Sequence, residues 1–150
     1  MPAEETASEA VALATLLLDA SRLLRAAAHA ETNLVPLPDS ERDVLRIVGA
    51  QPGISVGAVA RELRMRTSNV SAAVRSLVAR GLMVRDADPS DRRIARLTLT
   101  DLARHNLERL RRGWDAHLDE ALGRLEPAQR EAVESAVPAL RALVQALRLP

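Results

Sequence analysis

The sequence predicts a mainly α-helical fold with one short β-hairpin in its second half. Two observations support this prediction. Apolar residues recur at the spacing of an α-helix along most of the 150-residue chain. After Gly81 the spacing changes to the alternation of a β-strand, and helical spacing returns after Thr100. The length suits one domain with an added element and is enough to bury a core without cross-links.

Three helices are expected in the first part of the chain. The first covers about residues 6–30 and ends before a stretch with two prolines. The second runs from about Asp39 to Ala50 and is followed by the sequence QPG. Ser55 should cap a short third helix, because its hydroxyl can accept a hydrogen bond from the first turn.

The fourth helix is expected over residues 66–80, after a tight turn made by the sequence RMR. Thr67 should cap its start, and Gly81 should end it, because glycine readily adopts the left-handed conformation beyond a helix. The apolar stripe of this helix should be buried and contains Val70, Val74, Leu77 and Val78.

A hairpin and two long helices complete the chain. The sequences LMVRD and RRIARLTLT predict two strands, and Thr100 should cap the next helix, at about 101–124. A last helix should follow Glu126 and reach about Leu147, with a kink at Pro138 because proline lacks a backbone donor. Two short helices joined by a tight turn and followed by a two-stranded wing form a winged helix-turn-helix.

The long helices at both ends are apolar along one stripe and should not stand free in water. We therefore expect them to pair with the same helices of a second copy, giving a two-fold dimer. This divides the chain into an N-terminal dimerisation helix (1–35), a winged helix-turn-helix domain (36–100) and C-terminal dimerisation helices (101–150).

Charge is distributed unevenly along the chain. Residues 61–112 contain thirteen Arg and six acidic residues, a balance of +7, whereas the rest contains eight Arg and fourteen acidic residues, a balance of −6. A basic middle between acidic ends favours a nucleic-acid surface, although such stretches are often only solvated. The absence of Cys excludes disulfides and thiol switches. With no long apolar run and no signal pattern, we expect a cytoplasmic protein.

Small polar residues crowd the start of the fourth helix, although such residues form helices poorly. Short hydroxyl and amide groups let a helix approach the major groove of DNA closely. The predicted outward face is Ser68, Asn69, Ser71, Ala72 and Arg75. Helix capping alone is the alternative explanation for the first of these residues.

The loop of the wing, DPSDRR, offers a second contact with DNA. Arg92 and Arg93 can enter the minor groove, whose negative potential attracts arginine, and Asp91 can fix the direction of an arginine. A surface ion pair of little energetic weight is the alternative. Arg85 and Arg96 can contact phosphates or form pairs within the wing, and both readings stay open.

Residues 66–100, RTSNVSAAVRSLVARGLMVRDADPSDRRIARLTLT, resemble the MarR family of multiple-antibiotic-resistance regulators. The resemblance implies a homodimer that binds a pseudo-palindromic operator, usually as a repressor released by a small ligand or oxidant. For this chain we expect a small phenolic or amphipathic ligand. The resemblance places the outward residues of the fourth helix in the major groove. It also implies that Arg93 enters the minor groove while Asp91 holds it. Departures from the family are the sequence DLAR after LT, few aromatic residues and Pro138.

Enzymatic chemistry is not expected, and no cofactor or metal is implied. The three histidines are His29, His105 and His117. The last two are about 120° apart around one helix, so they do not share a face. His29 is expected to interact with the end of its helix, and Trp114 to lie in a core or dimer interface. A winged-helix module that binds protein and not DNA is the alternative function.

Overall fold

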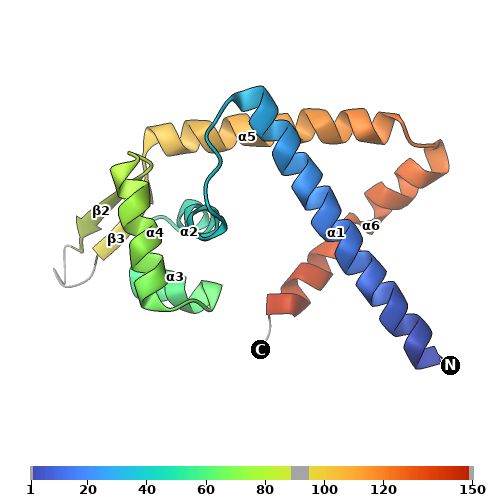
Figure 1. Cartoon of the computed structure of the whole chain (residues 1–150), viewed down its shortest axis with the longest axis horizontal. Coiled ribbons are helices and arrows are strands. Elements are labelled where there is room, and N and C mark those ends of the chain that lie inside the picture. Colours follow the sequence, from blue (N-terminus) through green and yellow to red (C-terminus); the bar gives the residue numbers. More distant parts are fainter. Residues whose placement is uncertain (1, 89–94, 149–150) are drawn as a thin grey trace. The chain divides into compact units, whose positions relative to one another are not determined.

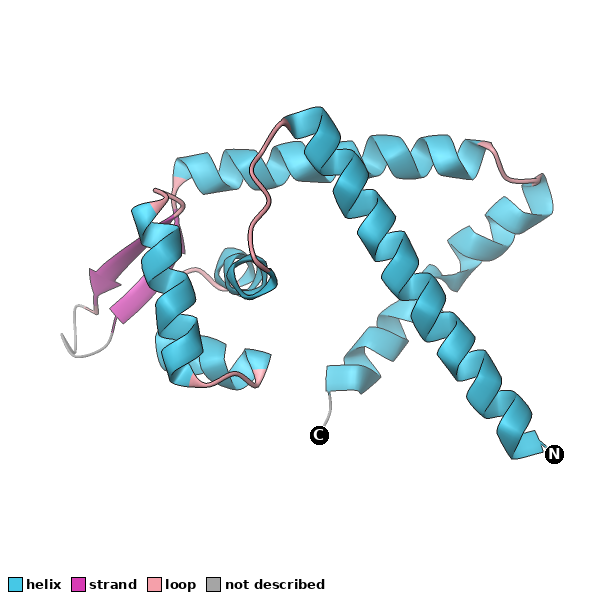
Figure 2. Ribbon diagram, in the orientation of Figure 1, coloured by secondary structure: helices cyan, strands magenta, loops and turns pink. Residues whose placement is uncertain are grey.

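The structure is a computed structural model that describes residues 2–88 and 95–148. It confirms the predicted mainly α-helical class and the winged helix-turn-helix (Figure 1, Figure 2). The elements are, in order, α1 (Pro2–Thr32), α2 (Asp39–Ala50), β1 (Ile54–Ser55), α3 (Val56–Leu63), α4 (Thr67–Ala79), β2 (Met83–Ala87), β3 (Ala95–Leu99), α5 (Asp101–Gly123) and α6 (Pro127–Arg148).

The chain divides into two compact units. One unit, the winged module, is His29–Arg112 and includes the predicted DNA-binding domain. The other, the helical unit, consists of Met1–Ala28 and Gly113–Pro150. Within the described residues, no helix combines the length and the apolar character needed to cross a lipid bilayer.

The winged module contains a three-stranded antiparallel sheet in the order β1-β3-β2. β2 and β3 form the predicted hairpin, with Met83 opposite Leu99 and Ala87 opposite Ala95. The sequence did not predict β1, which places Ile54 opposite Leu97 on the other edge of β3. β3 is therefore the central strand, which explains why Leu97 and Leu99 are buried.

The core of the winged module lies where α2, α3, α4 and the sheet meet. Val70, Val74 and Leu77 of α4 are buried, as predicted. The prediction for Val78 was wrong, since it is 41% exposed and Ala73 is buried in its place. The buried stripe is centred on positions 70, 73, 74 and 77, and Val78 lies about 100° beyond Leu77 at its edge.

Local contacts fix the helix ends. The hydroxyl of Ser55 accepts a hydrogen bond from the backbone N–H of Ala58 at 3.3 Å, as predicted. Gly81 ends α4 with φ +69°, also as predicted. The assignment of Thr67 as a cap was wrong: the cap residue is Arg66, with no capping hydrogen bond from its side chain, and Thr67 is the first helical residue.

Thr100 joins the end of α4 to the start of α5. Its hydroxyl donates to the carbonyl of Gly81 at 2.8 Å and accepts from the backbone N–H of Ala103 at 3.1 Å. The predicted cap at Thr100 is therefore confirmed, and the same side chain also satisfies the carbonyl of Gly81, just beyond α4.

The helical unit consists of long helices with large apolar side chains on their surface. α1 begins earlier than predicted, at Pro2, and α6 continues through Pro138. Among the described residues of this unit, only Ala28 and Gly113 are buried. Its exposed large apolar residues are Val11, Leu13, Leu16, Leu17, Leu18, Leu23, Trp114, Leu118, Leu125, Val133, Val137, Val144 and Leu147.

Candidate nucleic-acid interface

The outward face of α4 is polar and accessible. Ser68, Asn69, Ala72 and Arg75 are exposed, and Ser71 is half-buried. The opposite side of the helix packs into the core, so the helix cannot turn without unpacking it. The structure therefore brings the five predicted recognition residues to the accessible side of one rigid helix.

A buried carboxylate connects α4 to α2. Glu41, in the first turn of α2, is 7% exposed, and its Oε2 lies 3.5 Å from Nε of Arg80 at the end of α4. Oε2 has no hydrogen-bond partner among the described residues, so Arg80 supplies the compensating charge for a group that is costly to bury. This pair was not predictable from the sequence, because the two residues are far apart in the chain.

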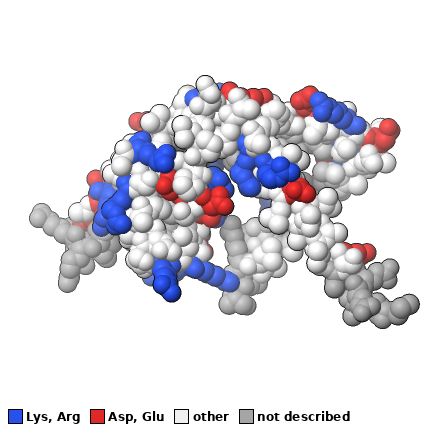
Figure 3. Space-filling model, in the orientation of Figure 1, with Lys and Arg blue, Asp and Glu red and all other residues white. Residues whose placement is uncertain are grey.

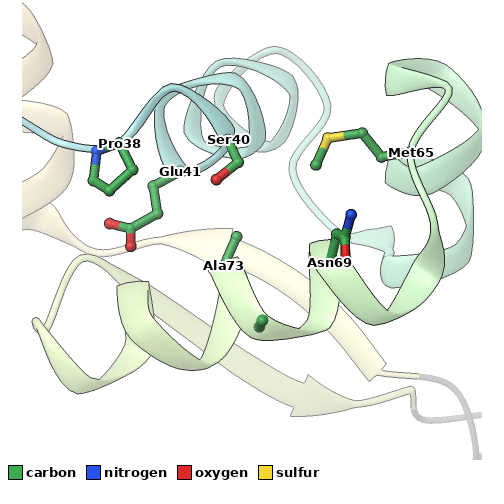
Figure 4. Close-up of a pocket in the computed structure, with 7 residues that line it drawn as sticks. Pro38, Ser40, Glu41, Met65, Asn69 and Ala73 are labelled. Atoms are coloured by element: carbon green, nitrogen blue, oxygen red, sulfur yellow. The ribbon is translucent and has the colours of Figure 1, made fainter.

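A shallow pocket lies between α2 and α4, with a volume of about 370 Å³. Figure 4 shows the Glu41 side chain extending from α2 toward α4, while Asn69 and Ala73 line the pocket from α4. The full lining is Pro38, Ser40, Glu41, Met65, Asn69, Ala72 and Ala73.

Arg85 and Arg96 of the wing differ in whether they form an ion pair within the wing. Arg96 donates from Nε to Oδ2 of Asp88 at 2.5 Å, so it forms a pair at the base of the wing. Asp88 is 6% exposed. Arg85 on β2 is exposed and has no ion pair within the described part of the chain. The predicted contacts Asp91, Arg92 and Arg93 lie outside the described residues.

Exposed arginines also gather where α3 meets α4, and the sequence reading assigned them no role. Basic side chains stand out along this edge of the winged module in Figure 3. The arginines at this junction are Arg61, Arg64 and Arg66, all of which are exposed. A signal was present in the sequence, since the RMR turn directly precedes the recognition helix.

The histidines and Trp114 were the residues considered for metal binding, catalysis or ligand binding. Nδ1 of His29 lies 3.3 Å from the carbonyl of Leu34, two residues beyond the last residue of α1. Among the described residues, no group of three or more His, Cys, Asp or Glu could hold a metal ion. Trp114 is 37% exposed on α5.

A MarR family model matches residues 35–94, which include α2, α3, α4 and most of the wing. Over these residues the winged module is similar to the MarR family. The matched family and the fold are those of transcription regulators. No curated protein sequence matches the chain.

Solved structures share the fold over nearly the whole chain. A candidate transcriptional regulator protein from Pseudomonas aeruginosa is 29% identical, with a TM-score of 0.82, and the match covers 94% of this chain and 96% of that one. FabT from Streptococcus pneumoniae, solved in complex with DNA, is 16% identical with a TM-score of 0.72, covering 93% and 98%. MarR itself is 20% identical with a TM-score of 0.68, covering 91% and 98%.

Proposed function

We propose that this protein is a transcription regulator that binds a pseudo-palindromic DNA operator as a homodimer. The observation that carries the proposal is the outward face of α4, where small polar residues and Arg75 are accessible on a helix fixed by its buried side. Short side chains permit close approach to base edges, Asn69 can pair with adenine, and Arg75 can reach guanine or a phosphate. We propose a cytoplasmic location together with this function.

The wing would provide the flanking contact. Each protomer would place α4 in a major groove and wing residues 85–96 in the adjacent minor groove. Within the wing, Arg92 and Arg93 would contact the minor groove, with Asp91 directing the arginine. The ion pair with Asp88 favours a supporting role for Arg96, because that pair fixes the end of β2 beside the loop.

The helical unit would hold two copies together. Its apolar residues are too numerous and too accessible for a lone chain in water, since Leu16 is 67% and Leu18 is 71% exposed. A second copy of the same helices would cover them in a two-fold arrangement. The two α4 helices would then read half-sites about 10 bp apart, centre to centre, or a small multiple of that.

Regulation by repression and release would follow the pattern of the family. A small phenolic or amphipathic ligand that changed the spacing of the two recognition helices would weaken binding to a palindromic site. Isothermal titration calorimetry with phenolic ligands, followed by measurement of DNA affinity, tests this part. Saturable binding that lowers the affinity is expected, and no binding with unchanged affinity would contradict it.

Fluorescence anisotropy with duplexes covering the region upstream of the gene tests DNA recognition. Tight binding to one duplex, weaker binding to a scrambled duplex and a strong salt dependence are expected. Asn69→Ala should reduce the preference for the operator, and Arg93→Ala should weaken binding through the wing. Absence of binding to any duplex at low salt would contradict the proposal and favour a winged-helix module that binds protein.

A further inference from the structure

We infer that the turn between α3 and α4 is a second DNA contact, in which Arg64 and Arg66 bind backbone phosphates beside the half-site. These two residues are called the arginine turn below. The inference rests on the proposed function and adds to it a named site and its ligand chemistry.

The turn presents the two arginines outward and anchors itself through the residue between them. Met65 is half-buried and packs against the core, and its backbone N–H donates to the carbonyl of Ala60 at 2.9 Å. Arg64 and Arg66 are exposed on either side of it. Arg66 directly precedes α4, so the arginine turn lies at the N-terminal end of this helix, next to Ser68 and Asn69.

Arg64 occupies a position whose backbone favours glycine. Its φ is 52° and its ψ is 38°, the left-handed conformation, at the residue that ends α3. Glycine adopts this conformation without the steric conflict that a Cβ introduces. At this position an arginine makes the backbone less stable than a glycine would.

Arg66 occupies a position whose local geometry favours a different side chain. It is the N-cap residue of α4, with no capping hydrogen bond from its side chain. Ser, Thr, Asp and Asn are preferred at this position because their side chains accept a hydrogen bond from the first turn, which arginine cannot do.

Arg64 and Arg66 thus both occupy positions whose backbone favours another residue. Together they place two guanidinium groups beside the recognition helix. Departures of this kind are expected at functional sites. Guanidinium groups bind phosphates through several N–H donors, and phosphate contacts position a protein on DNA without reading sequence.

The test replaces each arginine with the residue that its backbone prefers. Arg64→Gly should relieve the left-handed strain, and Arg66→Ser should supply the missing cap, so the Tm of each variant should equal or exceed that of the parent. DNA affinity should nevertheless fall, on the order of tenfold at low salt, equally for the upstream duplexes and a scrambled duplex. The slope of log K against log salt should decrease by about 1 for each protomer that contacts DNA.

Two control variants test whether the loss of DNA affinity depends on the position and the positive charge of the arginine turn. Arg46→Gln removes the same charge from an exposed position on α2, where Arg46 pairs with Asp43 at 3.8 Å, and should leave affinity unchanged. Arg66→Lys retains a cation at the turn and should retain most of the affinity.

The outcomes are distinguishable. Unchanged affinity in both arginine-turn variants, while the parent binds DNA, would overturn this inference and leave the proposed function intact. Parallel losses of Tm and affinity would show a structural role and overturn it too, and a loss confined to the specific duplex would replace the phosphate contact with base recognition. If the parent bound no duplex, the proposed function would fail and this inference with it.

Discussion

The winged module and the helical unit use apolar residues in opposite ways. The winged module directs its apolar residues into one core, in which Val44, Val48, Val59 and Leu77 are completely buried. The helical unit leaves Leu16, Val137 and Leu147 exposed. The first unit therefore has the packing of a self-sufficient fold, whereas the second has an exposed apolar surface that a second copy would cover under the proposed function.

The difference shows how one chain can satisfy two requirements. A recognition helix must be held rigidly, and a complete core around α4 provides this within a single copy. A palindromic site requires two recognition helices at a fixed spacing, and under the proposed function a second copy paired over the apolar surface would provide that spacing. The following predictions test this comparison, from the largest expected effect to the smallest.

Loss of core packing in the winged module should have the largest effect. Leu77→Ala removes a completely buried side chain and should lower the free energy of unfolding by about 2–5 kcal/mol. Val78→Ala, at the neighbouring exposed position, should lower it by less than about 1 kcal/mol. Urea denaturation at fixed protein concentration measures both. Equal losses would contradict the core described for α4.

A charge on the apolar surface of the helical unit should separate the two copies. Val137 is 49% exposed, so Val137→Glu should hardly affect an isolated chain. A buried charge in a dimer interface should raise the dissociation constant at least tenfold, equivalent to about 1.4 kcal/mol or more. Ser135→Glu adds the same charge about 200° around α6 and serves as the control. Sedimentation equilibrium should show dissociation only for Val137→Glu, and unchanged dimers in both variants would contradict this assignment.

Removal of Arg80 should lower the free energy of unfolding, because the buried carboxylate of Glu41 would lose its positively charged partner. Arg80→Gln leaves the carboxylate without its cation and should lower the free energy of unfolding by about 1–2 kcal/mol, since Arg80 itself is partly exposed. The double variant Arg80→Gln with Glu41→Gln should recover part of this loss, because the buried charge is gone. A strictly additive double variant would show that the two residues do not interact.

The smallest effect is expected at Thr100. Thr100→Val keeps the shape but removes the hydroxyl that bonds Gly81 and Ala103, and should lower the free energy of unfolding by about 1 kcal/mol. Thr100→Ser keeps both hydrogen bonds and should retain most of the stability. If both variants were as stable as the parent in thermal denaturation, the hydroxyl would not connect α4 and α5.

Regular periodicity made much of the fold predictable. The apolar spacing of α2 and the caps at Ser55 and Thr100 each depend on residues that are neighbours in the sequence. Local rules were therefore sufficient to predict them. β1 was missed because it has two residues and depends on pairing with the distant strand β3. Thr67 was misjudged because hydroxyl residues are favoured both at a cap and on a DNA-contacting face, and the sequence alone does not separate these roles.

The candidate site was predictable where it depends on one helix. The outward position of Asn69 and Arg75 follows from the apolar stripe on the other side of α4. The partners of Arg80 and Arg96 were not predictable, because ion pairs between elements depend on tertiary packing. The arginine turn was visible in the sequence, but its conflict with local backbone preference appears only with the dihedral angles of Arg64 and the N-cap position of Arg66.

The most direct measurement of the central claim is the stoichiometry of the complex with DNA. Native mass spectrometry of the free protein and of its complex with the upstream duplex that binds most tightly would count the chains. We predict a dimer in solution and two chains on one duplex. A monomer in solution that binds as one chain per duplex, with full affinity, would contradict the account of two recognition helices held by an apolar dimer interface.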